Sequence, residues 1–258
     1  MKDVQSQPDQ RNIPIDRVGV KNLRYPITVL DRAKKTQRTV AAINMYVNLP
    51  HLFRGTHMSR FVEILNENKR EIHINTIGEI LKSMKSKLSA EQAHMEVTFP
   101  YFMEKSAPVS RTKSLMEYGC SYVATLAETE DCILGVEVPV TTLCPCSREI
   151  SDRGAHNQRS LVRLQARFRG FVWIEELIDI AESAASCPIY ALLKRSDEKF
   201  VTEHSFDNPR FVEDVVREVA LRLNADSRIT WYRVESENLE SIHNHNAYAM
   251  IEKTLPSR

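Results

Sequence analysis

The residues best suited to chemistry are concentrated between Cys144 and Ser160, in the sequence CPCSREISDRGAHNQRS. This stretch follows a strand-like segment and contains almost no side chains of the kind that form a core, so packing does not explain it. Its two thiols and one imidazole, from Cys144, Cys146 and His156, are typical ligands of zinc or a similar divalent ion. Because Cys-x-Cys alone is a weak motif, a pair of inert buried thiols and a redox or nucleophilic thiol remain alternatives.

A pair of histidines lies nearer the C-terminus, where the sequence SIHNHN places His243 and His245 two positions apart. If the backbone there is extended, both imidazoles point to the same face, as a paired site requires. A polar loop with two exposed histidines is the alternative.

A charged cluster, Asp-Glu-Lys at residues 197–199, is followed closely by Glu203 and His204. Such a cluster between two predicted helices is most often a solvated loop. Glu213 differs, because it falls in the first turn of a predicted helix, where the helix dipole stabilises a carboxylate.

A basic stretch, FRGTHMSR, places Arg54, His57 and Arg60 around Gly55 and the start of a predicted helix. Cationic side chains and free N–H groups at a helix start can hold phosphate. Surface solubility explains these residues nearly as well.

The elements that must position these residues alternate between strands and helices. Alternating apolar residues predict strands at 19–29, 38–49, 93–103, 116–126, 133–143, 160–168, 229–235 and 247–252. Helical spacing and capping residues predict helices from Ser59, after Thr76, from Trp173 to about Ser186, and from Pro209 to Leu223 with Asn208 as N-cap. Each half of the chain therefore has the order ββααββ. The polar segment 1–14 is expected to be a mobile arm.

Composition narrows the class of protein. The chain has 258 residues, of which 42% are hydrophobic and 27% charged, and its formal net charge is only +1. These values are typical of a globular enzyme and imply neither nucleic-acid binding nor adsorption to membranes. The N-terminus lacks an apolar signal segment, and the five cysteines are an odd number. We therefore expect a cytoplasmic protein with reduced thiols.

Several motifs, taken in order along the chain, resemble the type IB GTP cyclohydrolases. They are GTHMSR at 55–60, PVTTLCPCSREIS at 139–151, GAHNQRS at 154–160, KR at 194–195 with DEK at 197–199, PRFVED at 209–214, and HNH at 243–245. The resemblance implies an α+β tunnelling fold with two tandem ββααββ-like modules, in which antiparallel sheets are backed by helices. It places the modules at 15–130 and 131–258, the second carrying most of the metal and catalytic residues, and it implies a homotetramer.

The resemblance also implies an activity. The family converts GTP and water into 7,8-dihydroneopterin triphosphate and formate, the first step of tetrahydrofolate synthesis, with one divalent ion per active site. Zinc or manganese is the expected ion, with iron or magnesium as alternatives. The residues that match the metal ligands are Cys144, His156 and Glu198, with Glu203 as a competitor of Glu198.

Other positions carry further expected roles. Glu213 resembles the carboxylate that anchors guanine, and the remaining active-site groups match Cys146, His243 and His245. Candidates to bind the triphosphate are Arg54, His57, Arg60, Lys194 and Arg195, with Arg148 and Arg159 as further possibilities. Two rival functions remain: a related purine or pterin enzyme with a different product, such as a cyclic phosphate, and a non-catalytic scaffold with a structural metal. A structural site would be closed by four protein ligands, whereas an enzyme keeps one position open for water.

Overall fold

The computed structural model describes residues 5, 7, 10–51, 53–68 and 70–256. Its contacts divide the chain into two compact units. Unit 1 comprises residues 1–100 and 121–134, and unit 2 comprises residues 101–120 and 135–258. The modules expected at 15–130 and 131–258 stay a prediction, because three long strands contribute residues to both units.

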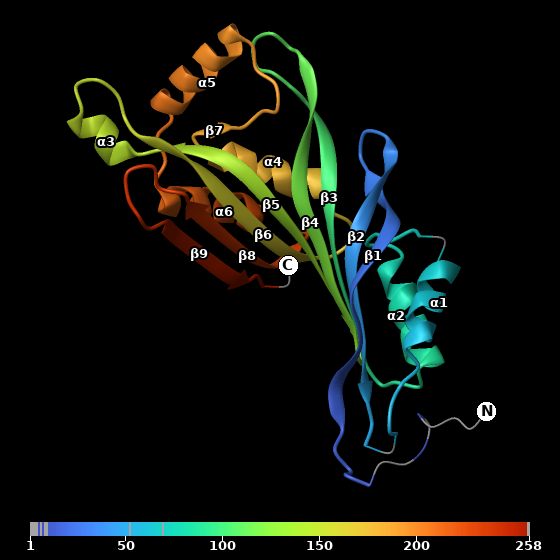
Figure 1. Ribbon diagram of the computed structural model, residues 1–258. Helices are drawn as coiled ribbons and strands as arrows, with labels where there is room; N and C mark the ends of the chain where they lie inside the picture. Colours follow the sequence, from blue (N-terminus) through green and yellow to red (C-terminus); the bar gives the residue numbers. More distant parts are fainter. Residues whose placement is uncertain (1–4, 6, 8–9, 52, 69, 257–258) are drawn as a thin grey trace. The chain divides into compact units, whose positions relative to one another are not determined.

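Unit 1 is built on a long antiparallel hairpin. Its strands are β1 (Ile15–Asp31) and β2 (Lys35–Leu49), and β2 also pairs with β3 (Ala93–Ser106). The sheet continues with β4 (Lys113–Leu126) and β5 (Glu130–Leu143). Helices α1 (Met58–Glu67) and α2 (Ile77–Lys87) lie side by side against the hairpin, as Figure 1 shows.

The core of unit 1 follows from the two periodicities of its sequence. Alternate residues of β2, including Ile43, Met45 and Val47, are buried. On α1, Phe61, Ile64 and Leu65 are buried at helical spacing. Burying each large apolar side chain stabilises the fold by roughly 1.5–3 kcal/mol.

The start of α1 corrects one expectation. His57, not Ser59, is the N-cap residue, with extended backbone angles of φ −84° and ψ 105°. Its carbonyl accepts a hydrogen bond of 3.2 Å from the backbone N–H of Arg60, so the helical turn begins two residues earlier than predicted. Thr76 precedes α2, as predicted.

Of the expected mobile arm at 1–14, residues 1–4, 6, 8 and 9 lie outside the described residues. The backbone carbonyls of Gln5 and Gln7 accept hydrogen bonds from Gly55 and Arg54, at 3.1 and 2.9 Å. The mobility of the arm stays a prediction.

Unit 2 has the strand order β3-β4-β5-β6-β8-β9, with the short β7 (Cys187–Pro188) paired to β5. The later strands are β6 (Asn157–Phe168), β8 (Ile229–Asn238) and β9 (Ala247–Thr254). Helices α4 (Ile174–Ala184) and α6 (Val212–Ala225) cover one face of this sheet (Figure 1). Their buried stripes, such as Val215 and Val219 of α6, pack onto alternate residues of β6 and β8.

Two further helices of unit 2 were not predicted. The short α3 (Pro145–Ile150) follows β5, and α5 (Arg195–Asp207) occupies the region expected to be a charged loop. The sequence of α5 has no apolar stripe, and its only buried residues are Asp197 and Ser205. Asp197 starts this helix by accepting a 2.8 Å hydrogen bond from the backbone N–H of Lys194.

The position of α5 explains a second correction. Asn208 is not the N-cap of α6, because it ends α5 and its side-chain amide donates to the carbonyls of Ala185 and Ser186. The N-cap of α6 is Phe211, whose backbone N–H donates to the carboxylate of Asp214 at 3.0 Å.

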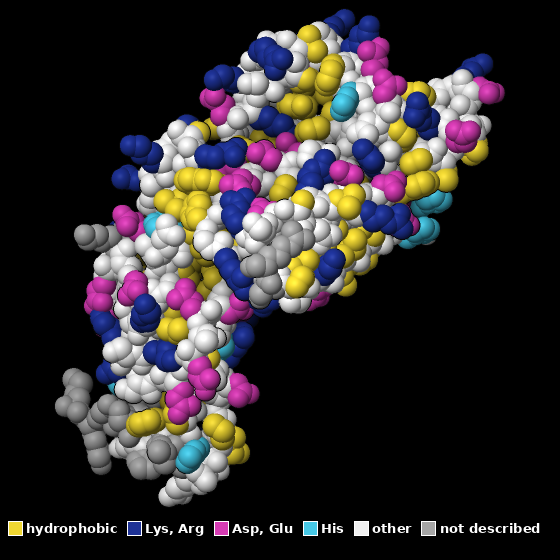
Figure 2. All heavy atoms as spheres, turned by 180° about the vertical axis from the view of Figure 1, so that it is seen from behind, with side chains coloured by type: hydrophobic (Ala, Val, Ile, Leu, Met, Phe, Trp, Pro, Cys, Tyr) yellow, Lys and Arg dark blue, Asp and Glu magenta, His cyan; other side chains and the backbone are white. Residues whose placement is uncertain are grey.

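Charges of both signs are interspersed on the face drawn in Figure 2, which agrees with a net charge of +1. Within the described ranges, no helix is both long and apolar enough to cross a bilayer.

Candidate active site

The chemistry-rich stretch forms a loop at the end of β5 that returns to the start of β6. Cys144 caps α3, and its sulfur accepts a hydrogen bond from the backbone N–H of Ser147 at 3.4 Å. The backbone N–H of Cys144 donates to the carbonyl of His156 at 3.1 Å, and the backbone N–H of His156 donates to the Ser147 hydroxyl at 3.0 Å. Gly154 in this loop has a φ of 143°, a backbone conformation that favours glycine. These bonds hold the predicted thiol and imidazole ligands at the same end of the sheet.

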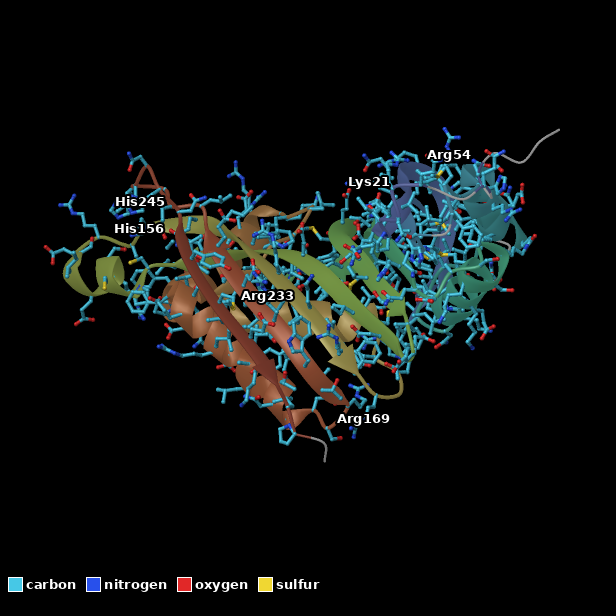
Figure 3. The ribbon with its side chains drawn as sticks, turned by 90° about the horizontal axis from the view of Figure 1, so that it is seen from below. Lys21, Arg54, His156, Arg169, Arg233 and His245 are labelled. Atoms are coloured by element: carbon cyan, nitrogen blue, oxygen red, sulfur yellow. The ribbon has the colours of Figure 1, made fainter. Side chains whose placement is uncertain are left out.

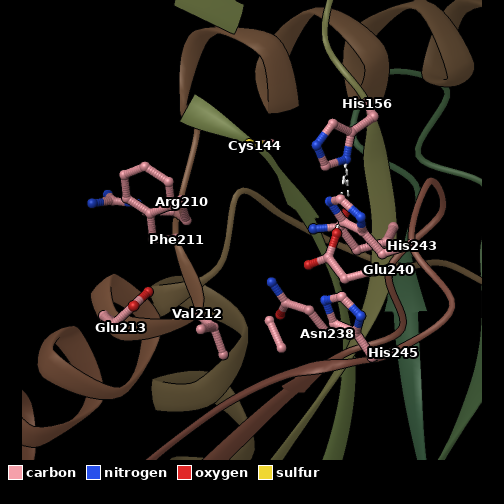
Figure 4. Close-up of a pocket in the computed structure, with 12 residues that line it drawn as sticks. Cys144, His156, Arg210, Phe211, Val212, Glu213, Asn238, Glu240, His243 and His245 are labelled. Carbon is pink, nitrogen blue, oxygen red and sulfur yellow. Dashed lines mark hydrogen bonds and ion pairs between the residues drawn. The ribbon is translucent and has the colours of Figure 1, made fainter. Parts of the chain in front are cut away.

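A pocket with a volume of about 310 Å³ opens at this end of unit 2. Figure 3 shows His156 and His245 close together there, and Arg169 at the opposite end of the sheet. The residues lining the pocket, drawn in Figure 4, are Cys144, His156, Gln158, Arg210, Phe211, Val212, Glu213, Asn238, Glu240, His243, His245 and Ala247.

His156 is held by two neighbours that line the same pocket. Its Nδ1 lies 3.2 Å from Oε1 of Gln158 and 3.9 Å from a carboxylate oxygen of Glu240. The side chains of His156 and Glu240 are only 16% and 10% exposed. A carboxylate beside one ring nitrogen of a neutral imidazole favours the tautomer whose N–H faces that carboxylate.

The histidine pair lies on the same side of this pocket as His156 and Glu240 (Figure 4). Residues 241–245 form a bend between β8 and β9, so the extended backbone that would place both imidazoles on one face of a strand is not present. The rings nevertheless lie together, because His243 and His245 stack with centroids 5.1 Å apart and planes inclined by 14°.

Glu213 lies in the first turn of α6, as predicted, and its side chain lines the pocket. The chain leading into this helix is fixed by a 3.0 Å hydrogen bond from the backbone N–H of Arg210 to the carbonyl of Leu143. The Nε of Arg210 is buried and has no hydrogen-bond partner among the described residues. A charged donor of this kind can bind an anionic ligand in the pocket.

Several predicted site residues do not line the pocket. Cys146 is exposed on α3. Lys194, the N-cap of α5, and Arg195 and Glu198 in its first turn are exposed as well. Glu203, the competitor of Glu198, is exposed and pairs with Lys199 at 3.7 Å. Among the described residues, no three His, Cys, Asp or Glu side chains are gathered closely enough to hold a metal ion.

The basic stretch expected to hold phosphate belongs to unit 1, outside the pocket. Arg60 donates to the carbonyl of Lys87 at 3.0 Å, and Arg54 and His57 precede α1.

The sequence predictions assigned no role to four polar residues that line the pocket: Gln158, Arg210, Asn238 and Glu240. Two of them stand inside motifs already singled out, GAHNQRS and PRFVED. Glu240 lies three residues before His243, and that proximity is the one signal that could have identified it.

Comparison with solved structures defines the class to which this fold belongs. Urate oxidase from Bacillus subtilis matches with a TM-score of 0.55 and 7% identity, over 94% of this chain and 100% of that one. Urate oxidase from Bacillus sp. TB-90 matches with a TM-score of 0.55 and 10% identity, over 93% and 100%. These identities show the fold alone, and the predicted α+β tunnelling fold is confirmed.

The sequence comparisons then identify the family. The family described as type I GTP cyclohydrolase FolE2 matches residues 1–249. The GTP cyclohydrolase FolE2 of Syntrophotalea carbinolica is 61% identical over 252 residues, covering 98% of this chain and 95% of the relative. That of Syntrophus aciditrophicus is 60% identical over 254 residues, covering 98% and 100%. The chain therefore belongs to the type I GTP cyclohydrolase FolE2 family and is an enzyme, as the resemblance predicted.

Proposed function

We propose that this enzyme converts GTP and water into 7,8-dihydroneopterin triphosphate and formate, the first step of tetrahydrofolate biosynthesis, in the pocket of unit 2. The observation that carries this proposal is the composition of that pocket. A thiol, three imidazoles and two carboxylates line one cavity, and they come from Cys144, His156, His243, His245, Glu213 and Glu240. Ring opening, formate release and ring closure need both proton transfer and an anchor for the base.

We further propose that the pocket holds one divalent ion, with zinc or manganese as the expected ion. The donor types fit, because the pocket is lined by the thiol of Cys144, the imidazole of His156 and the carboxylate of Glu240. When bound, such an ion activates water for attack on C8 of guanine. Cys144 and His156 supply two ligands, and Glu198 stays the predicted third. Since Glu198 is exposed on α5, this proposal requires that α5 moves or that the carboxylate reaches the site of a neighbouring subunit.

Glu213 fits the role of guanine anchor. Glu213 lines the pocket from the first turn of α6. A carboxylate accepts two parallel hydrogen bonds, one from N1–H and one from the exocyclic amine of guanine, and adenine does not present that pair of donors. The helix dipole also stabilises the anionic form at this position.

His243 and His245 are suited to move protons, since both rings line the pocket. Histidine is the side chain whose ordinary pKa lies closest to neutral pH, which favours proton transfer in both directions. Cys146 remains the predicted additional active-site thiol, two residues beyond Cys144 on α3.

The triphosphate needs cations, and within the pocket Arg210 is the basic residue with an unpaired donor among the described atoms. We propose that the other predicted cations join the site by assembly of a homotetramer through the edge strands β1 and β9. Those cations are Arg54, His57, Arg60, Lys194 and Arg195. The exposed thiol of Cys146 and the free state of all five cysteines fit a reducing, cytoplasmic location.

The proposal is tested by incubating the purified enzyme with GTP and each divalent ion in turn. Formate and, after oxidation, a fluorescent pterin should form with at least one ion and not with a chelator. A related enzyme with a different product would consume GTP but form another product, such as a cyclic phosphate with loss of pyrophosphate in place of the triphosphate, which mass spectrometry of the product distinguishes. A scaffold with a structural metal would leave GTP unchanged.

A further inference from the structure

Behind His156, a line of buried polar side chains crosses three neighbouring strands of unit 2. Nε2 of Gln158 donates to the hydroxyl of Thr142 at 2.9 Å, and that hydroxyl lies 2.7 Å from the hydroxyl of Ser160. Ser160 donates to Oδ1 of Asn238 at 2.7 Å. We call Gln158, Thr142, Ser160 and Asn238 the polar chain. It begins 3.2 Å from Nδ1 of His156 and ends at an amide that lines the pocket.

The strands place these four residues on one face. Ser160 of β6 lies directly opposite Asn238 of β8, and Gln158 lies two residues before Ser160. Thr142 comes from the adjacent strand β5. Further along the same face, apolar Val162 lies opposite Ser236 and apolar Leu164 lies opposite Val234. The buried hydroxyl of Ser236 has no hydrogen-bond partner among the described residues and does not belong to the polar chain. All four members of the polar chain are buried, with exposed fractions of 0–7%. Buried polar groups are costly unless they are paired, so the chain must be satisfied as a unit.

The number of hydroxyl protons allows the polar chain only two arrangements of its hydrogen bonds. Each hydroxyl donates one hydrogen bond. If Ser160 donates to Asn238, then Thr142 must donate to Ser160 and must accept from Gln158. The amide oxygen of Gln158 then faces His156, whose Nδ1 has to carry the proton. In the second state, donor and acceptor are exchanged in every one of these hydrogen bonds. The side-chain NH₂ of Gln158 then donates to an unprotonated Nδ1 of His156.

The surroundings of the two ends favour the first state. The carboxylate of Glu240 lies 3.9 Å from Nδ1 of His156, which favours the Nδ1–H tautomer of the neutral ring. At the other end, the first state turns the Asn238 amine towards the pocket, where it donates to no group among the described residues. A hydrogen-bond acceptor on a bound ligand would therefore favour the same state.

We propose that the polar chain fixes His156 as the Nδ1–H tautomer and so leaves the Nε2 lone pair free to bind the divalent ion. Gln158, Thr142, Ser160 and Asn238 are thus positioning residues that act through His156. The inference rests on the proposed metal role of His156. Outer hydrogen-bond partners of this kind typically change metal affinity by about 10- to 100-fold when they are removed.

The experiment compares the parent with Thr142→Val, Thr142→Ser and Thr141→Val. Thr142 does not line the pocket, and Thr141 is the neighbouring threonine with its side chain on the other face of β5. Side-chain ¹⁵N NMR of the metal-free proteins, at a pH where the rings are neutral, reports which ring nitrogen of His156 is protonated. His156→Asn assigns the signal among the eight histidines. Zinc affinity is measured on the same four proteins.

We expect the Nδ1–H form in the parent, in Thr142→Ser and in Thr141→Val. Thr142→Val should show the Nε2–H form or a mixture, with zinc affinity lower by about 10- to 100-fold. If Thr142 acted only through packing, Thr142→Ser should lower zinc affinity more than Thr142→Val. The reason is that valine keeps the shape of threonine, whereas serine loses a methyl group. If Thr142→Val does not fold, Gln158→Leu removes the acceptor itself and should weaken zinc binding by a similar factor.

Two results would overturn the inference: an Nε2–H form in the parent, or an unchanged tautomer and zinc affinity in Thr142→Val. A parent that binds no zinc would instead contradict the proposed metal site, while the tautomer measurement would still decide the role of the chain.

Discussion

The imidazoles of His243 and His245 stack with their centroids 5.1 Å apart, although the segment that carries them is a bend and not a strand. Both rings line the pocket that also contains Cys144 and His156. We expect His243→Ala and His245→Ala each to lower kcat by roughly 100-fold or more, the usual effect of losing a general acid or base, with an unchanged thermal midpoint. Near-normal kcat in both variants would exclude them from proton transfer, and insoluble protein would indicate a structural role.

The two cysteines of the Cys-Pro-Cys motif should behave differently. Cys144 lines the pocket beside His156, whereas Cys146 is exposed on α3. Cys144→Ala should abolish GTP turnover and most metal binding, because it removes a thiolate ligand. Cys146→Ala should keep more metal. Metal content of the purified variants checks this, and an equal loss in both would indicate two cysteine ligands.

The carboxylate ligand is decided by comparing Glu198→Gln with Glu240→Gln. We expect Glu198→Gln to lose most of the metal, as the family resemblance predicts. Glu240→Gln should weaken metal binding only by about 10- to 100-fold, because its carboxylate lies beside Nδ1 of His156. A larger loss in Glu240→Gln, measured by titration with zinc, would transfer the ligand role to Glu240.

Glu213→Gln separates guanine recognition from helix stabilisation. The NH₂ group of the introduced glutamine would face an N–H donor of guanine, so neither group would have a hydrogen-bond acceptor. Each buried polar group left without a partner costs about 1–3 kcal/mol of binding free energy. GTP affinity and kcat/KM should therefore fall at least tenfold while the metal stays bound. Lost helix-dipole stabilisation alone would cost only about 0.3–1 kcal/mol. Glu218→Gln on the same helix is the matched control, since Glu218 pairs with Arg222 and does not line the pocket. A Glu213→Gln variant that binds GTP like the parent would remove Glu213 from the site.

Asp197 makes stability depend on pH. It accepts hydrogen bonds from Val109, Ser110 and Lys194, which tie the hairpin between β3 and β4 to the start of α5. Burial raises the pKa of Asp197, but these hydrogen bonds outweigh that effect and hold its pKa below the ordinary value. The stabilisation is therefore present above the ordinary pKa of about 4 and is lost as pH falls towards the lower folded value.

Asp197→Asn should consequently unfold more easily than the parent at pH 7, and this difference in unfolding free energy should shrink between pH 4 and pH 3. Urea unfolding at each pH measures it, with Asp207→Asn on the exposed end of α5 as control. A difference that does not vary with pH would contradict the role of the ionised carboxylate.

Much of the fold could be predicted because its strands and most of its helices have clear hydrophobic periodicity. The strands expected at 38–49 and 133–143 lie within β2 and β5. Helix α5 could not be predicted, because it is held by the four hydrogen bonds of Asp197 and not by an apolar stripe. Likewise, Asn208 has the residue type of an N-cap, but its side-chain amide donates to the carbonyls of Ala185 and Ser186. No local sequence pattern indicates these two hydrogen bonds.

The residues of the candidate site were also only partly predictable from the sequence. Cys144, His156, Glu213, His243 and His245 were recognisable from residue type and motif, and they line one pocket. Glu240 and the polar chain depend on which strands become neighbours, and that information is not local in the sequence.

The most direct measurement uses GTP labelled with ¹³C at C8 of guanine, followed by NMR in the presence of enzyme and zinc or manganese. If C8 is hydrolysed and released, the label should appear as free formate in an amount equal to the GTP consumed, and Glu213→Gln should do so at least tenfold more slowly. Label that stays on the nucleotide, either as intact GTP or as a formylated product, would contradict the proposed reaction.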